Sequence, residues 1–127
     1  MRTVFNTIQN MSRKFSCYIL RLQEGKFYVG STLTRNVQNR FEMHCNGSGA
    51  KWCRTYRPIE IIHVIDNLTS QEAFKREDTE CVRIMREQND IQICRGGSYN
   101  FPPGSDWWYR QWGTDANPAD TAWLAAH

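Results

Sequence analysis

The sequence lacks any apolar run long enough to cross a lipid bilayer, and its mean hydropathy is -0.66. It has no long tract of a single residue type, and 40% of its residues are hydrophobic, which excludes an intrinsically disordered chain. The opening stretch MRTVFNTIQNMSRK has neither the apolar core nor the small-residue cleavage site of a secretory signal. We therefore expect a globular protein that stays inside the cell and has no membrane partner.

Common catalytic and metal-binding signatures are also missing. The sequence contains no Walker-type phosphate loop, no HExxH and no GxSxG motif. Its five cysteines include no CxxC pair, and together with the histidines they match no zinc-binding template. An odd number of cysteines in this pattern is typical of buried free thiols in a reducing compartment.

Acidic residues are scarce in the first half of the chain. Residues 1–60 contain three Asp or Glu against ten Lys or Arg, a net charge of +7, whereas residues 61–127 carry a net charge of -4. The N-terminal half is therefore expected to face a polyanion. Pairing of the two halves across one surface explains the same composition equally well. A mass of 14.9 kDa corresponds to one domain.

A β-hairpin is predicted near the start of the chain. The segments 16–22 and 26–31 are rich in β-branched and aromatic residues and are separated by a three-residue loop that contains glycine. With a loop of that length, even-numbered residues of one strand pair with even-numbered residues of the other. Tyr18 and Tyr28 therefore project from the same face, within reach of one shared ligand.

Two helices are predicted after the hairpin. Apolar residues recur at helical spacing over 35–45, and Asn46-Gly47 supplies a C-terminal stop. On this helix Arg40 and His44 are four residues apart and flank the apolar stripe, so they point toward the body of the protein.

The second predicted helix runs from about Ser70 to Gln88, because Thr69-Ser70-Gln71-Glu72 forms a capping box. Its apolar stripe contains a carboxylate, Glu77. Burying a carboxylate without a partner is costly, so Glu77 needs a cation, a hydrogen-bond donor or a metal.

The segments between and after these elements carry weaker signals. Residues 46–57, NGSGAKWCRTYR, are expected to form a loop whose cations and aromatic rings suit phosphates and unstacked bases. A solvated loop with Trp52 in the core is an equally good interpretation. The apolar run within 59–66 predicts a central strand. From Asp90 onward we expect an irregular but ordered wrap through the tryptophans, followed by a loose end after Asn117.

The order of these residues resembles the GIY-YIG endonuclease family, over about residues 16–89. Cys17-Tyr18-Ile19 stands at the place of the first motif, and Tyr28-Val29-Gly30 stands at the place of the second. Both segments differ from the consensus motifs of the family but keep the tyrosine of each motif. Arg40 and His44 follow on one helix, and the segment EAFKRE ends in Glu77 on the next.

The resemblance implies an α+β fold with a small, mainly antiparallel three-stranded sheet and flanking helices. We expect an N-terminal arm over 1–14, one nuclease domain over 15–95, and an aromatic, Gly- and Pro-rich C-terminal extension over 96–127 that includes the tryptophan cluster. This extension is also a candidate surface for a protein partner. The segment Arg95 to Tyr99, RGGSY, resembles a phage and large-virus subgroup of these nucleases.

The resemblance also implies catalytic roles and a cofactor. Glu77 is expected to bind Mg²⁺ or Mn²⁺, which needs only one or two protein carboxylates. Arg40 is expected to hold the scissile phosphate, and Tyr18 to orient or deprotonate the attacking water. Tyr28 is expected to position the phosphate or water, and His44 to take or relay a proton. The family asparagine is assigned to Asn89, with Asn100 as its competitor.

The implied function is a divalent-metal-dependent DNA endonuclease. The expected substrate contacts are Ser31, Lys51, Trp52, Arg54, Arg57 and Arg95. A sequence-specific restriction or homing nuclease is one alternative. A catalytically inactive nucleic-acid-binding module is another, and a protein-interaction domain built on the tryptophan cluster is a third.

Overall fold

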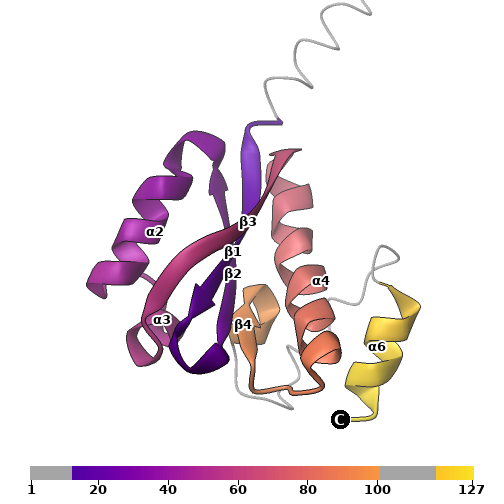
Figure 1. Cartoon of the computed structure of the whole chain (residues 1–127). Helices are drawn as coiled ribbons and strands as arrows, with labels where there is room; N and C mark the ends of the chain where they lie inside the picture. The colour runs from indigo at the N-terminus through magenta and orange to yellow at the C-terminus, as the bar shows by residue number, and fades with distance from the viewer. Residues whose placement is uncertain (1–12, 101–116) are drawn as a thin grey trace, which may run out of the picture.

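The computed structural model describes residues 13–100 and 117–127. Along the chain, these residues form the helices and strands β1 (Phe15–Leu22), β2 (Phe27–Leu33), α2 (Val37–Asn46), α3 (Lys51–Thr55), β3 (Pro58–Leu68), α4 (Ser70–Gln88), β4 (Cys94–Gly96) and α6 (Pro118–Ala125) (Figure 1). Three short 3-10 turns connect them: η1 (Gln23–Gly25), η2 (Thr34–Asn36) and η3 (Gly97–Asn100). Most of the predicted N-terminal arm and most of the tryptophan cluster lie outside the described residues.

The sheet has four strands in the order β3-β1-β2-β4. The first three are antiparallel neighbours, as expected, and β4 runs parallel to β2. The expectation of three strands was therefore wrong by one. The reason is that β4 spans only Cys94–Gly96, inside a glycine-rich stretch where no alternating pattern marks a strand.

The β1–β2 hairpin has the predicted register. Tyr18 lies opposite Gly30, and Leu20 lies opposite Tyr28, so the two tyrosines share a face. The loop of η1 closes the hairpin because Gly25 adopts a left-handed φ of 71°, which glycine reaches without steric cost. The pairing register of the hairpin places the two tyrosines on one face, and this register follows from the three-residue length of the loop.

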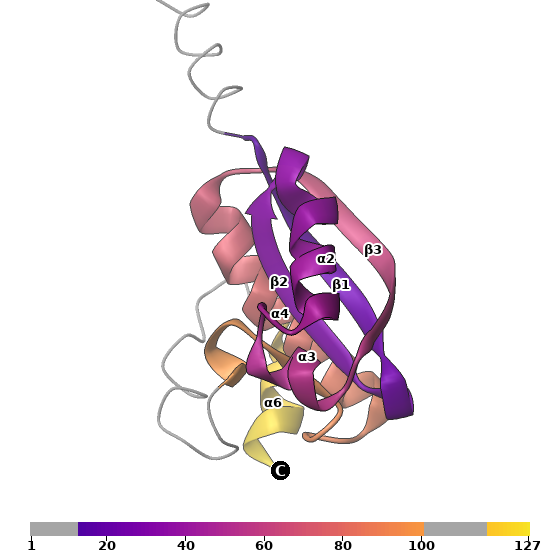
Figure 2. The same cartoon turned by 90° about the vertical axis from the view of Figure 1, so that its left-hand side faces the viewer.

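The helices cover the two faces of the sheet (Figures 1 and 2). On one face, Tyr18 and Leu20 form a buried cluster with side chains of α2 and α3. On the other face, Ile19 and Val29 pack against α4. The bounds of α4 agree with the prediction, and the capping box between Thr69 and Glu72 is present.

β3 is an edge strand, which corrects the expectation of a central one. Among the described strands it pairs only with β1, and its side chains Ile59, Ile62 and Val64 are 46%, 44% and 36% exposed. Ile61 and Ile65 are the isoleucines of this strand that join the cores on the two faces. An apolar run therefore does not by itself distinguish a central strand from an edge strand.

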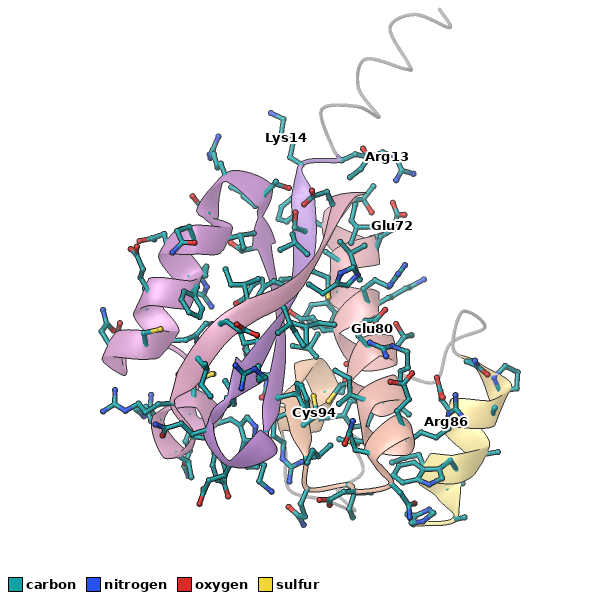
Figure 3. The ribbon with its side chains drawn as sticks, viewed as in Figure 1. Arg13, Lys14, Glu72, Glu80, Arg86 and Cys94 are labelled. Carbon is teal, nitrogen blue, oxygen red and sulfur yellow. The ribbon has the colours of Figure 1, made fainter. Side chains whose placement is uncertain are left out.

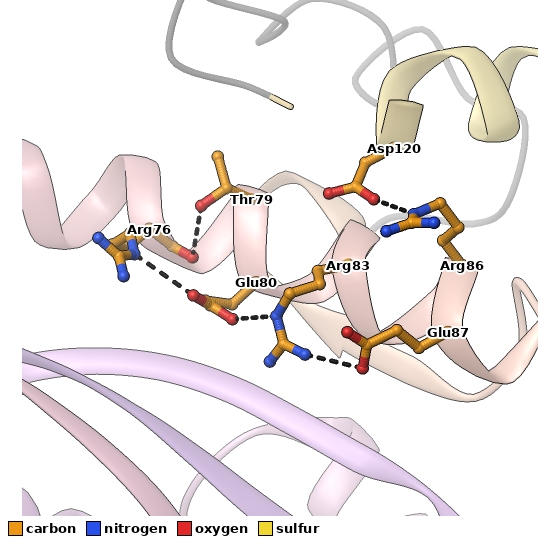
Figure 4. Close-up of polar contacts among 7 residues, drawn as sticks. All are labelled: Arg76, Thr79, Glu80, Arg83, Arg86, Glu87 and Asp120. Carbon is orange, nitrogen blue, oxygen red and sulfur yellow. Dashed lines mark hydrogen bonds and ion pairs between the residues drawn. The ribbon is translucent and has the colours of Figure 1, made fainter. Parts of the chain in front are cut away.

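Two segments expected to be irregular contain helices. The loop predicted over 46–57 includes α3, and the end predicted to be loose after Asn117 forms α6, which Asn117 caps by accepting a hydrogen bond from the Ala119 amide. α6 is held to α4 by the ion pair between Arg86 and Asp120 (Figure 4). Among the described residues, no helix is long and apolar enough to span a membrane.

Candidate active site

A gap in strand pairing exposes one stretch of the sheet edge. β4 pairs with Phe27, Tyr28 and Val29 of β2 and then ends, so β2 from Gly30 onward has no neighbour on that side among the described strands. Side chains from opposite faces of the sheet can therefore approach each other around this open edge. Glu77 reaches it from α4, where it accepts a hydrogen bond of 2.7 Å from Ser31 of β2.

On the other face, two tyrosines and a histidine form a compact aromatic group. The ring centroid of Tyr28 lies 4.9 Å from that of His44 and 6.4 Å from that of Tyr18. The Tyr18 Oη and His44 Nε2 atoms are 2.9 Å apart, at hydrogen-bond distance. All three side chains are buried, which fixes their relative orientation.

The hydrogen bonds of His44 determine its tautomer. The backbone amide of Ala50 donates to His44 Nδ1 over 3.0 Å, so this nitrogen carries no proton. Burial, followed by the positive charge of Arg40, lowers the pKa of His44 to about 4, so the ring is neutral at physiological pH. The single ring proton therefore sits on Nε2, and His44 donates it to the Tyr18 oxygen.

Two glycines make this close packing sterically feasible. A Cβ atom on Gly30 would lie 2.5 Å from Tyr18 Oη, and a Cβ atom on Gly49 would collide with the ring and backbone of His44. Gly30 is the last residue of the second motif. Gly49 lies in the turn that brings the Ala50 amide to His44. Both positions therefore favour glycine because a neighbouring side chain occupies the space.

Arg40 supplies the positive charge of the site. Its Nε atom is buried without a hydrogen-bond partner among residues 13–100 and 117–127. Burial raises the pKa of Tyr18 to about 12, while the nearby Arg40 guanidinium acts in the opposite direction. Arg40 therefore lies close to the Tyr18 hydroxyl, and its Nε is a donor that the described residues leave unsatisfied.

The surroundings of Glu77 only partly stabilise the charged form of its carboxylate. Burial raises its pKa to about 7, and the charge of Asp78 adds to that effect. The hydrogen bond from Ser31 and the charge of Arg40 act in the opposite direction but do not restore an ordinary value. A divalent cation at this carboxylate would remove the penalty, because its charge stabilises the ionised form.

The donor set of the site fits a hydrated Mg²⁺ rather than a cation held in a protein cage. Within the described part of the chain, no group of three or more His, Cys, Asp or Glu side chains is arranged to hold a metal. Mg²⁺ keeps most of its water ligands and commonly takes one or two carboxylates together with substrate oxygens. Glu77 offers one such carboxylate, and Ser31 orients it.

Comparison with known proteins agrees with this arrangement. A family model described as the GIY-YIG catalytic domain matches residues 14–80, more than half of the chain, and this range includes Tyr18, Arg40 and Glu77. The chain belongs to the GIY-YIG family. This family generally comprises endonucleases that act on DNA, so membership points to a nuclease.

Several bacterial relatives share the same region. A UPF0213 protein of Oceanobacillus iheyensis is 34% identical over 67 residues, which cover 53% of this chain and 76% of that relative. A UPF0213 protein of Staphylococcus epidermidis is 36% identical over 64 residues, or 50% of this chain and 76% of the relative. A UPF0213 protein of Streptococcus pneumoniae is 30% identical over 67 residues, which cover 53% of this chain and 66% of that relative. No solved structure matches the chain significantly.

The structure does not bring Asn89 to the GIY-YIG site. Asn89 ends α4 as a left-handed cap with a φ of 51°, and its side chain accepts a hydrogen bond from Trp123 of α6. It lies twelve residues beyond Glu77, or roughly 18 Å along a helix that rises about 1.5 Å per residue. Asn100 ends η3, which packs beside Glu77: a Cβ atom on Gly97 would lie 3.1 Å from the Glu77 Cβ.

Several expected substrate contacts have partners within the protein. Arg54 and Arg57 donate to the backbone carbonyls of Gly49 and Cys45, and the Trp52 indole donates to the carbonyl of Phe27. Lys51 is exposed on α3.

Trp52 and Arg95 pack against each other in the structure. The Trp52 ring contacts that of Tyr56, and the Arg95 guanidinium lies 4.7 Å from the Trp52 ring centroid. Arg95 is only 5% exposed and donates to the carbonyls of Ile91 and Cys94. The structure therefore places these two side chains in internal packing, with their binding roles still predictions.

Sequence reasoning missed two groups that shape the site. The Ala50 amide fixes the tautomer of His44, and only the glycines of the preceding turn hint at such a close approach. Asp78, beside Glu77 in sequence, accepts hydrogen bonds from the Ser98 amide and hydroxyl and so anchors η3 to α4. Asp78 has no sequence signal of its own, since Ser98 lies twenty residues away.

Proposed function

We propose that this GIY-YIG protein is a divalent-metal-dependent endonuclease that hydrolyses phosphodiester bonds in DNA. The observation that carries the proposal is the convergence, at the open edge of β2, of a guanidinium donor, a half-buried carboxylate and a hydroxyl that accepts a hydrogen bond from a histidine. Arg40 is the donor, Glu77 the carboxylate and Tyr18 the hydroxyl. Each belongs to a different secondary-structure element, so only the folded chain assembles them.

Arg40 binds the scissile phosphate in this proposal. Its buried Nε lacks a partner among the described residues, and a guanidinium can bind two phosphate oxygens at once. As water attacks phosphorus, negative charge grows on the non-bridging oxygens, and the fixed guanidinium stabilises it.

Tyr18 orients the attacking water and, once its own phenol proton has passed to solvent, takes up the proton of that water. The proton on His44 Nε2 is directed at Tyr18 Oη, so the phenol oxygen receives a hydrogen bond that favours its ionised form. The water oxygen then bonds to phosphorus while the bond from phosphorus to the leaving sugar oxygen breaks, and the leaving oxygen takes a proton from solvent. The neutral His44 thus serves as a donor to Tyr18, a role more specific than the proton relay expected from sequence.

Glu77 and Ser31 hold the cofactor in this proposal. A bound Mg²⁺ or Mn²⁺ supplies positive charge for the leaving oxygen and lowers the pKa of nearby oxygen acids. Tyr18 needs such help because burial raises its pKa to about 12. The proposal is supported by the uncompensated charge of Glu77 and by the hydrogen bond that orients its carboxylate.

Asn100 is the better candidate for the family asparagine. It is exposed at the end of η3, and Asp78 fixes that turn beside Glu77 through Ser98. Asn89 is committed to the far end of α4. An Asn100→Ala variant should therefore lose activity, whereas Asn89→Ala should alter only the packing of α6.

A plasmid-nicking assay with and without Mg²⁺ tests the function. Wild-type protein should convert supercoiled to nicked plasmid only with metal, and Glu77→Gln should not. Glu80→Gln is the matched control, since it makes the same change one turn along α4, where Glu80 pairs with Arg76 and Arg83 (Figure 4).

Binding without nicking under every metal condition would favour an inactive nucleic-acid-binding module instead. Cleavage restricted to one sequence would favour a restriction or homing nuclease. A panel of duplex, nicked, flap, branched and single-stranded DNAs then defines the preferred substrate.

A further inference from the structure

A cavity that is open to solvent lies at one end of the sheet, outside the candidate active site. It has a volume of about 560 Å³ and is formed where β1 begins, β2 ends and β3 ends. Figure 3 shows Arg13 and Lys14 at this end of the molecule, with Glu72 beside Arg13. Its lining residues are Arg13, Lys14, Leu33, Thr34, Arg35, Asp66 and Asn67.

The cavity is electropositive. Its lining contains three cations and one carboxylate. Lys14 and Arg35 are exposed, and neither has an ion-pair or hydrogen-bond partner for its side chain within residues 13–100 and 117–127. Arg13 is partly neutralised, because it pairs with Glu72 at 2.9 Å. Lys14 and Arg35 are therefore the two charges available to a ligand.

Hydrogen bonds join the segments of the cavity wall, and the one carboxylate of the lining, Asp66, already accepts one of them. The buried Ser16 hydroxyl donates to Asp66 over 2.7 Å and lies 2.6 Å from the Thr34 hydroxyl. A carboxylate only accepts, so Ser16 uses its single proton on Asp66 and accepts from Thr34. The Thr34 amide also donates to the carbonyl of Lys14 over 2.8 Å. These bonds fix the segments that carry Lys14 and Arg35.

The cavity and the candidate active site share two elements. Three residues of extended chain separate Ser31 from Thr34, or roughly 10 Å at about 3.3 Å per residue. Five residues separate Arg35 from Arg40 at the start of α2, or roughly 7.5 Å at about 1.5 Å per residue. Both separations are short on the scale of a bound nucleic-acid strand, which rises about 3.4 Å per nucleotide along the duplex axis.

We propose that this cavity binds a phosphate of the nucleic-acid backbone close to the cleaved bond, with Lys14 and Arg35 as its ligands. The inference rests on the proposed nuclease function. It places the phosphate track along the edge of β2 and the start of α2, in contrast to the track over Lys51, Arg54 and Arg57 expected from sequence. The exposed, unpaired cations of the cavity support it, since Arg54 and Arg57 already donate to backbone carbonyls.

The test compares two double variants that each remove one lysine and one arginine. Lys14→Ala/Arg35→Ala removes the two cations of the cavity that are available to a ligand. Arg21→Ala/Lys26→Ala is the matched control at the opposite end of the β1–β2 hairpin, where Arg21 pairs with Glu60. Fluorescence anisotropy with a labelled 30-base-pair duplex in EDTA gives the affinity at several salt concentrations. Melting curves check that both variants fold.

The cavity variant should reduce the slope of log affinity against log salt by about two, one for each phosphate-facing cation removed, while the control leaves it close to the wild-type value. Its cleavage rate at saturating DNA should stay within about threefold of wild type. Equal slopes for the two double variants, or a cavity variant with the wild-type slope, would overturn the inference and leave the nuclease assignment intact. A wild-type protein that neither binds nor nicks DNA would overturn both.

Discussion

Replacing Glu77 by glutamine should stabilise the metal-free protein, by an amount that depends on pH. Burial raises the pKa of Glu77 from its ordinary value of 4.5 to about 7. The folded state therefore holds this proton over a range in which the unfolded state has already released it. The resulting penalty is absent well below pH 4.5, grows as the pH rises toward 7, and is complete above pH 7. A glutamine does not ionise and escapes the penalty.

The size of the effect follows from the two pKa values. Each unit of difference corresponds to about 1.4 kcal/mol, so the penalty is about 3 kcal/mol at pH 8 and about 1 kcal/mol at pH 5. These values are upper bounds because Glu77 retains some contact with solvent. Glutamine can still accept the hydrogen bond from Ser31, so little is lost in exchange.

Urea denaturation of the two proteins in EDTA at both pH values measures the difference. Glu80→Gln serves again as the control and should show no such gain, because Glu80 pairs with two arginines of its own helix. Adding Mg²⁺ at pH 8 should stabilise the wild type and leave Glu77→Gln unchanged. The reasoning is refuted if Glu77→Gln is less stable than wild type at pH 8, or if the difference is the same at both pH values.

Three further variants probe the rest of the site. Tyr18→Phe keeps the buried ring but leaves the His44 Nε2 proton without its acceptor. It should therefore cost about 1–3 kcal/mol of folding stability and most of the cleavage activity. Full activity per folded molecule would remove Tyr18 from catalysis. Arg40→Lys keeps the positive charge but loses the planar guanidinium that can bind two phosphate oxygens at once. Single-turnover cleavage should therefore slow by about 100-fold with little change in DNA affinity. Near-normal turnover would mean that Arg40 contributes only its positive charge. Gly49→Ala should displace His44 from the Ala50 amide, because the added Cβ would collide with the His44 ring, and should slow cleavage by about tenfold or more. Nitrogen NMR shifts of His44 that still report a pure Nε2–H tautomer would contradict this prediction.

Local sequence features determined the elements that carry the site. A three-residue loop sets the parity of the hairpin, so the shared face of Tyr18 and Tyr28 follows from the sequence alone. The capping box sets the start of α4, and an interval of four residues places Arg40 and His44 on one side of α2. These features depend on backbone geometry within a few residues, which tertiary contacts did not override.

Only the tertiary structure decided which neighbours these elements received. β3 has the composition of a central strand and lies at the edge, because among the described strands it has β1 as its one partner, while β4 pairs with β2 on the other side of the sheet. That β4 is so short leaves the edge at Gly30 open, which lets Glu77 approach the tyrosines from across the sheet. Strand order depends on pairing between distant segments, and the side chains of one segment do not encode which other segment will lie beside them.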